Sequence, residues 1–476
     1  MWQWINETLG KFEISIGDRR TYSWFVIIII GLMIRTDTTG VTSIVRALNL
    51  SAATYPLLLH FFKSERFAIN QLEWHWQKIL ANSPLLYRVR GMAVMPGDGV
   101  MKSKEGRYMP GVKKLHQESE NSAKGEYIFG HMFGGLGVII GSQCRKMYCA
   151  LISLRLHGGL DTINSWHGCE GYKEDTHVVK IVKDASRAVR AFGTSILLLD
   201  RLFLSVPMLK ALAAEPLLKA VTKAKINAKA FFHPKPKTKP GPGAPRKKGD
   251  KIKVASLFDA MSDSFTVATA LMYGEMAEIS YYCVDLLWGE QWYQNLRFVL
   301  VWYEGKKSIL VSTDLTLLPI EIIELYCHRF KIECAFRELK QVVSGFGYQF
   351  WSKYMPKLNR YKSNGFHQEQ QNAVTEGFKR EAMLKTVKAI ECFTLLSCIA
   401  LGMLQMISLL FSDAIAARAV RFMRTPSKVV PSEATVADFM RKSFYQLFYF
   451  FPNLAITAII KSKQVELERD SFASMA

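Results

Sequence analysis

The chain has 476 residues, of which 49% are hydrophobic, and a formal net charge of +21 at pH 7. This length is sufficient for more than one hydrophobic core, which excludes a small disulfide-bonded scaffold. The positive charge favours a polyanionic partner, with nucleic acid first and an anionic membrane surface second.

The eight cysteines form no C-x-x-C pair and lie in apolar or helical segments. They are Cys144, Cys149, Cys169, Cys283, Cys327, Cys334, Cys392 and Cys398. We expect buried thiols in a reducing cytoplasm. Cys169 lies close to His167, but this pair lacks the second half of a zinc site and is interpreted as structural.

The N-terminal region, residues 1–85, is expected to be helical and to bind DNA. The apolar segment 24–34 has only eleven residues, too few to span a membrane, and predicts a buried helix or strand. Residues 37–66 contain two apolar runs at helical spacing with a polar break between them. This pattern fits a helix-turn-helix, although the local sequence alone favours an ordinary helical hairpin.

From residue 86 to residue 232 the pattern changes to that of an α/β unit. Strands are predicted at 91–95, 126–140, 147–156 and 196–199, and helices at 177–192 and 207–212. The first strand leads into a Pro-Gly-Asp-Gly run, which we interpret as a turn containing Asp98. The strand at 196–199 stops at Asp200. The order strand, strand, strand, helix, strand, helix is typical of an α/β fold.

Residues 233–317 are expected to form a basic linker and a β-rich insertion. The stretch 233–251 is rich in Pro, Gly and Lys, and either follows a phosphate backbone or is a solvated linker. Strands are predicted at 279–287, 296–303 and 308–313. Residues 318–345 should be helical, followed by a helical C-terminal region, 346–476. Within it, the apolar run 390–411 contains Glu391 and Gln405, which favours a core helix over a membrane span.

The most informative segment runs from Tyr326 to Lys340. On a continuous helix, Tyr326, Arg329, Glu333 and Lys340 fall within one stripe about 60° wide, at about 100° per residue, and Arg337 borders it. Geometry alone favours a surface helix with ion pairs four residues apart.

The pattern Y-x2-R-x3-E-x6-K resembles the signature of bacterial insertion-sequence transposases of the DDE class, in the group named for these four residues. The aromatic and aliphatic positions between them also resemble that group: Phe330, Ile332, Phe336 and Leu339. The resemblance implies a ribonuclease-H-like catalytic core, a mixed sheet with flanking helices, interrupted by a mostly β insertion. Its first Asp lies on the first strand, its second at the end of the fourth, and its Glu on a late helix.

Asp98 and Asp200 occupy the places that this scheme requires, and the segments GDGVMKSKEGRYMPGVKKLHQESE and LLLDR resemble their surroundings in the family. The resemblance therefore implies that Asp98, Asp200 and Glu333 are the catalytic and metal-binding residues. Asp161, which follows another apolar strand, is the alternative to Asp98.

Carboxylate oxygens are the ligands that Mg²⁺ prefers, and two such ions about 3.5–4 Å apart can activate the attacking oxygen and stabilise the leaving one. Two Mg²⁺ ions are therefore expected, with Mn²⁺ as a substitute, and Asp98 is expected to bridge them.

The cations and the phenol of the same segment are expected to bind DNA phosphates: Tyr326, Arg329, Arg337 and Lys340. In related transposases an aromatic side chain stacks on a flipped base. Trp302 and Trp292 are candidates here, although a packed core position is the simpler interpretation for each.

The expected function is cut-and-paste transposition by a homodimer on double-stranded DNA, in which the enzyme cleaves the inverted-repeat ends of the element and joins them to target DNA. The expected location is the bacterial cytoplasm, on the nucleoid when bound, without a membrane. Two alternatives stay open: a transposase-derived protein that binds DNA without cutting it, and a basic membrane-associated protein.

Overall fold

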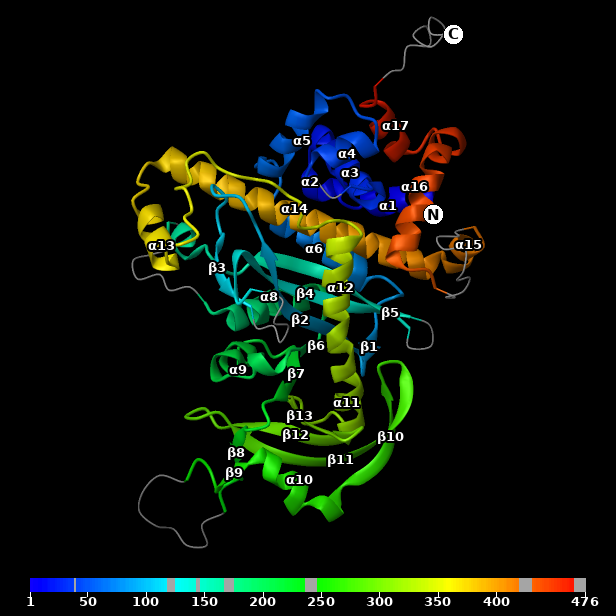
Figure 1. Ribbon diagram of the computed structural model, residues 1–476. Coiled ribbons are helices and arrows are strands. Elements are labelled where there is room, and N and C mark those ends of the chain that lie inside the picture. Colours follow the sequence, from blue (N-terminus) through cyan, green and yellow to red (C-terminus); the bar gives the residue numbers. More distant parts are fainter. Residues whose placement is uncertain are drawn as a thin grey trace, which may run out of the picture.

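The computed structural model describes residues 1–37, 40–117, 125–142, 146–166, 175–235, 246–418 and 430–465. The protein is mixed α/β, with thirteen paired strands that connect into one large mixed sheet flanked by helices. Figure 1 shows the N-terminal and C-terminal helices at one end, the α/β unit in the middle and the β-rich insertion at the other end. The expectations for Cys144, His167, Cys169 and linker positions 236–245 lie outside the described residues.

The N-terminal region is helical, as predicted. Its helices are α1 (Trp2–Gly10), α2 (Glu13–Ile16), α3 (Arg19–Ile34), α4 (Thr42–Ala47), α5 (Thr54–Lys63) and α6 (Ile69–Ala81). The apolar run 24–34 is the buried part of α3, which begins where the Asp18 carboxylate accepts a hydrogen bond from the backbone N–H of Thr21 at 3.0 Å. The two short helices predicted within 37–66 are α4 and α5.

The α/β unit follows in the predicted order. Its elements are β1 (Arg88–Val89), β2 (Met92–Ser103), β3 (Lys113–His116), β4 (Tyr127–Gly141), β5 (Met147–Leu156), α7 (Asp161–Ser165), α8 (His177–Phe192), β6 (Ser195–Leu198), the 3₁₀ turn η1 (Arg201–Phe203), α9 (Val206–Ala213) and β7 (Leu218–Ala224). The strands lie side by side as β5-β4-β2-β6-β7; β4 is antiparallel to β2 and β5, whereas β2, β6 and β7 are parallel. Strand β7 was not predicted from the sequence.

The insertion extends this sheet. Its elements are β8 (Lys229–Phe231), β9 (Lys251–Lys253), η2 (Val254–Ser256), α10 (Leu257–Ala260), η3 (Ser262–Ser264), β10 (Thr266–Met272), β11 (Glu275–Trp288), β12 (Gln294–Tyr303) and β13 (Lys306–Ser312). The three predicted strands are β11, β12 and β13. Because β13 pairs antiparallel with β7, the insertion is attached edge to edge to the α/β unit. Its first strand, β8, pairs with β9 and β11 and so lies slightly before position 233.

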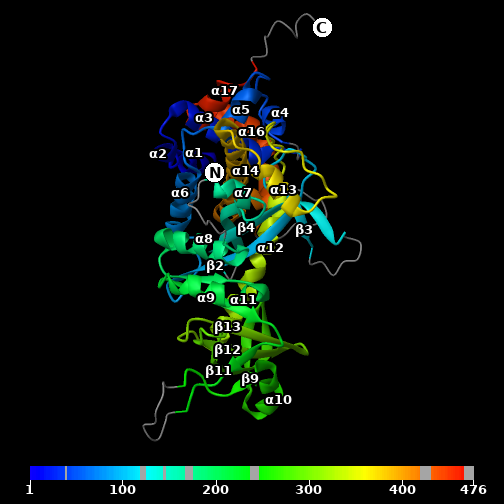
Figure 2. The same ribbon diagram turned by 90° about the vertical axis from the view of Figure 1, so that its left-hand side faces the viewer.

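The remainder is helical. Its elements are α11 (Pro319–Cys327), the 3₁₀ turn η4 (His328–Phe330), α12 (Lys331–Gln341), α13 (Asn364–Asn372), α14 (Gly377–Leu410), α15 (Ser412–Ala416), α16 (Glu433–Phe450) and α17 (Ala455–Lys461). Figures 1 and 2 show α11 and α12 running from the insertion along the α/β unit toward the terminal helices.

Helix α14 is the core helix expected from the apolar run 390–411. Within the described residues it passes the length and hydropathy test for a membrane span, as the bent pair α16 and α17 does together, but 89% of the apolar window of α14 is buried inside the protein. Its charged residue Glu391 pairs with Arg155 of β5 at 3.3 Å and accepts the backbone N–H of Leu156. The burial of α14 is typical of a core helix.

Four of the six described cysteines are buried, and all six are free thiols. Cys283 and Cys334 are partly exposed, so the expectation of burial is wrong for these two. Cys334 lies on α12, where its neighbours Ile332 and Ala335 take the buried positions of the helix.

The opposite faces of β2 are covered by α8 and α12. A Cβ atom on Gly97 would lie 2.9 Å from Ile181 of α8, and one on Gly99 would lie 2.7 Å from the His177 ring. Asp98 lies between these glycines and therefore points to the other face. Its cross-strand partner, Gly135 of β4, lies against Phe336 of α12. Asp98 thus lies within a strand and faces α12, so the prediction of a turn at this position is wrong.

This packing predicts that Gly99→Ala destabilises the protein. The added methyl group would meet the imidazole of His177, which is held by a 2.9 Å hydrogen bond to His157. We expect a loss of about 1–3 kcal/mol in the free energy of unfolding, as for other overpacked positions. Urea denaturation measures this loss. Gly10→Ala is the control, because nothing lies within 4 Å of its new methyl group; a loss as large as that of Gly99→Ala would contradict the packing argument.

Candidate active site

Three carboxylates that are distant in the sequence meet beside the sheet. Asp98 lies on β2, Asp200 follows the parallel neighbour β6 and precedes η1, and Glu333 lies in the first turn of α12. Strand β6 ends next to Asp98 because Pro96 of β2 is the partner of Leu198. Helix α12 packs on β2 and brings Glu333 to the same face.

The segment that carries Glu333 is not one continuous α-helix. A 3₁₀ turn, η4, separates α11 from α12 and contains Arg329. A 3₁₀ turn has about 3.0 residues per turn instead of 3.6, so it rotates the residues before it relative to those after it. The expectation of a single stripe on a straight helix is therefore wrong. Arg329 lies between α11 and α12 and reaches the carboxylates of Asp98 and Glu333.

The guanidinium of Arg329 joins two of the three carboxylates. Its Nη1 donates to Asp98 Oδ2 at 3.2 Å, and its Nη2 donates to Glu333 Oε1. Only 15% of the Arg329 side chain is exposed, so this contact is more than a surface ion pair. The third carboxylate, Asp200, accepts a hydrogen bond from the Tyr326 hydroxyl. Two residues of the signature thus hold the three acidic groups in one place.

The electrostatics of Asp98 reflect this crowding. Burial raises the pKa of Asp98 from 3.8 to about 6. The Gly99 N–H and Arg329 act against the rise, whereas the charges of Glu333 and Asp200 add to it. An additional cation near these groups would therefore stabilise the ionised form of Asp98.

The remaining signature cations lie apart from the carboxylates. Lys340 lies near the other end of α12 and lines a cavity with residues of β2 and of the N-terminal helices. Arg337 pairs with the adjacent Glu338 and lines a different cavity, formed with α3 and α16. Of the four residues predicted to bind DNA, Tyr326 and Arg329 are therefore the two that lie directly against the acidic groups.

The other candidates lie elsewhere. Asp161 begins α7 and accepts a hydrogen bond from Gln368 of α13 at 3.2 Å. The carboxylates that raise the pKa of Asp98 are those of Glu333 and Asp200, and Asp161 is not among them. Trp292 and Trp302 are 39% and 43% exposed, so the interpretation of both as core residues is wrong. Trp302 packs beside Phe258 and Lys307 in the insertion, away from α12.

Two residues that were not predicted from the sequence border the site. Tyr273 occupies the turn between β10 and β11 with a φ of 54° and is 66% exposed. It lies close enough to Arg329 and Tyr326 for electrostatic interaction with both: Arg329 lowers the pKa of Tyr273, and Tyr273 raises the pKa of Tyr326. Lys223, on the unpredicted strand β7, lies near Asp200; burial lowers its pKa, Arg201 lowers it further, and Asp200 raises it. The turn that contains Tyr273 could have been predicted from its Tyr-Gly pair, which lies between two strand-like runs.

The residues present fit a divalent metal ion of the hard type. The donor set is carboxylate oxygen, which Mg²⁺ prefers, and it carries more negative charge than Arg329 balances. Among the described residues no three acidic, His or Cys side chains are close enough to hold one ion together. Two ions would each need only part of this set, and Asp98, Asp200 and Glu333 together would supply their carboxylate ligands.

No protein-family model matches the chain, and no curated protein matches it.

The raised pKa of Asp98 predicts a pH-dependent effect on stability. The folded protein binds a proton at Asp98 more tightly than the unfolded chain does, so the free energy of unfolding should fall as pH rises from about 4 to above 6. A rise from 3.8 to about 6 corresponds to about 3 kcal/mol. In urea denaturation with EDTA, we expect Asp98→Asn to stabilise the protein by about 2–3 kcal/mol at pH 7.5 and by no more than about 1 kcal/mol at pH 4.5, where Asp98 is protonated in the folded protein. An equal difference at both pH values would contradict this account.

Proposed function

We propose that this protein is a DNA transposase of the DDE class, in the group with the Y-x2-R-x3-E-x6-K signature, built on a ribonuclease-H-like core. One observation carries the proposal: Arg329 contacts both Asp98 and Glu333, and Tyr326 contacts Asp200. An ordinary surface helix with ion pairs would not place Arg329 and Tyr326 against aspartates of two neighbouring strands.

The topology supports the same proposal. If the short strands β1 and β3 are set aside, Asp98 lies on the first strand of the α/β unit and Asp200 follows the fourth, β6. A β-rich insertion separates Asp200 from the helix of Glu333. These are the three positions that the resemblance requires.

The chemistry assigned to the site is phosphodiester cleavage followed by strand transfer. Asp98, Asp200 and Glu333 would hold two Mg²⁺ ions, which activate the attacking oxygen and stabilise the leaving oxygen. Arg329, which contacts Asp98 and Glu333, would also offer its guanidinium to a phosphate of the bound strand. The Tyr326 hydroxyl and Lys340 add further phosphate contacts, which position the strand without reading its sequence.

The substrate in this proposal is double-stranded DNA: the inverted-repeat ends of the element, and then target DNA. The protein would act as a homodimer on paired ends in the bacterial cytoplasm. The net charge of +21 favours binding to DNA over long range.

A nicking assay tests the proposal. Labelled DNA that carries the inverted repeats flanking the coding region is incubated with the purified protein and Mg²⁺, and cleavage at the repeat ends is expected. DNA of the same length without the repeats is the control. Specific binding without cleavage would support the alternative of a DNA-binding protein, and recovery in membranes after a high-salt wash would support the membrane-associated alternative.

A further inference from the structure

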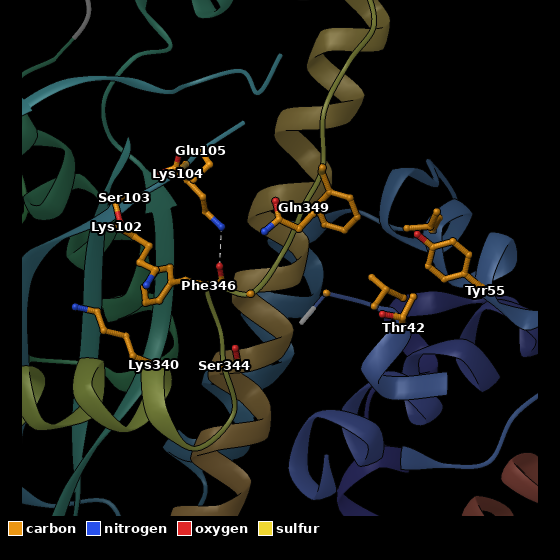
Figure 3. A pocket seen from close by; sticks show the side chains of 15 residues that line it. Thr42, Tyr55, Lys102, Ser103, Lys104, Glu105, Lys340, Ser344, Phe346 and Gln349 are labelled. Carbon is orange, nitrogen blue, oxygen red and sulfur yellow. Dashed lines mark hydrogen bonds between the residues drawn. The ribbon is translucent and has the colours of Figure 1, made fainter. Parts of the chain in front are cut away.

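A cavity of about 530 Å³ lies between the N-terminal helices and the far ends of β2 and α12. Figure 3 shows Lys102, Lys104 and Lys340 on one side of it and Thr42 and Tyr55 on the other. Its volume lies within the range that accommodates a small organic ligand. The cavity therefore lies between α12, which carries Glu333, and helices α4 and α5.

The β2 side of the cavity is basic. Lys102 makes no ion pair within the part of the chain that the structure describes. The Lys104 ammonium is bound to the carbonyl oxygens of Phe346 and Tyr348 and lies 3.5 Å from the centre of the Tyr348 ring, so it fixes the segment after α12. Glu105, the acidic residue of the lining, is paired with Arg360. The net charge of this side is therefore positive, which favours a phosphate.

The opposite side offers aromatic and hydroxyl groups. The Tyr55 side chain is 37% exposed at the N-terminal end of α5, and Phe346 and Phe350 line the floor. Thr42 and Gln349 add polar groups that can bind the edge of a base. A flat apolar ring beside cations is the combination that binds single-stranded nucleic acid by stacking and charge.

The cavity lies in line with the carboxylates. Lys102 follows Asp98 by four residues on the same face of β2, a distance of about 13 Å at about 3.3 Å per residue. Lys340 follows Glu333 by seven residues on α12, about 10 Å at about 1.5 Å per residue. Both elements thus lead from the acidic site to the cavity, so a strand that leaves the carboxylates in this direction reaches the cavity within a few nucleotides.

We propose that this cavity binds one nucleotide of a DNA strand that runs from the carboxylates along β2 and α12 to α5, with its phosphate at Lys102 and its base against Tyr55. The inference rests on the proposed function, because it assumes that the strand at the carboxylates is DNA. It adds to the contacts at the carboxylates a second contact of the same DNA strand, at the N-terminal helices.

The test compares fluorescently labelled element ends that carry single-stranded tails of two or eight nucleotides, with the tail on either strand. The wild-type protein should bind the eight-nucleotide tail about tenfold more tightly than the two-nucleotide tail, since one stacked base is sufficient for this difference. Tyr55→Leu, which keeps the bulk but removes the flat ring, should abolish the difference.

Lys102→Gln should reduce the slope of log K against log salt by about 0.7, the value for one phosphate of a single strand. Lys229→Gln, an exposed lysine on β8, is the matched control and should change neither quantity.

Equal affinity for both tails, or equal effects of Lys102→Gln and Lys229→Gln, would overturn this inference. Competition by free dAMP without any effect of tail length would overturn it too, because the cavity would then take a free nucleotide. Cleavage of the DNA with the two-nucleotide tail, measured in the same samples, separates failure of the cavity assignment from failure of the proposed function. If this DNA is cleaved with Mg²⁺, only the cavity assignment fails. If no substrate is cleaved, the proposed function is contradicted.

Discussion

Asp98→Asn, Asp200→Asn and Glu333→Gln are each expected to reduce Mg²⁺-dependent DNA cleavage by at least about a thousandfold. Each change keeps the size of the side chain but removes the negative charge that a metal ligand needs, and the loss of about 4 kcal/mol of transition-state stabilisation corresponds to this factor. Binding to the element ends should be largely unchanged, because the three carboxylates repel DNA rather than attract it. The measurement is the initial rate of cleavage, with binding followed in parallel without metal.

Asp161→Asn is the matched control for these three variants. Asp161 is the alternative to Asp98 by sequence, but it interacts with Gln368 of α13. We expect it to cleave DNA at a rate close to that of the wild-type protein. Loss of cleavage in Asp161→Asn together with retained cleavage in Asp98→Asn would show that the site has been assigned to the wrong aspartate.

Arg329→Met is expected to reduce cleavage by about a hundredfold or more. The largely buried guanidinium is the group that holds Asp98 and Glu333 together, and in the proposed mechanism it then binds a phosphate. A lysine cannot make both contacts with one planar group, so Arg329→Lys should recover only part of the rate. Single-turnover cleavage at saturating protein measures the loss independently of DNA affinity.

Arg337→Met tests whether this effect belongs to Arg329 or to charge on α12 in general. Arg337 is exposed, pairs with Glu338 and lines a different cavity. We expect a change of less than about threefold in the cleavage rate. Equal losses for both arginines would indicate a general electrostatic effect and would remove the structural role assigned to Arg329.

Much of the fold followed from the sequence because local patterns determined it. The alternating and apolar runs that form β4, β5 and β6 were recognisable, as was the strong amphipathic period of α8. The core role of α14 could be predicted from Glu391 and Gln405, which would be costly in a membrane; Glu391 is paired with Arg155 inside the protein.

Other features depend on contacts that no local pattern contains. The Pro-Gly-Asp-Gly run has the composition of a turn, but its glycines are required because α8 packs directly on β2. Strand β7 was missed because its two lysines, Lys219 and Lys223, are four residues apart, a spacing that also fits a helix. The 3₁₀ turn at Arg329 and the approach of Tyr273 depend on how the insertion and α11 meet.

Iron-directed cleavage of the protein tests the central claim most directly. Fe²⁺ replaces Mg²⁺ at many oxygen sites and, with ascorbate and peroxide, produces hydroxyl radicals that cut the nearby backbone. We expect cuts near residues 98, 200 and 333 of the same chain, all suppressed by excess Mg²⁺ and all lost in Asp98→Asn. Cuts near only one of these positions, or cuts that Asp98→Asn leaves unchanged, would show that the three carboxylates do not share bound metal.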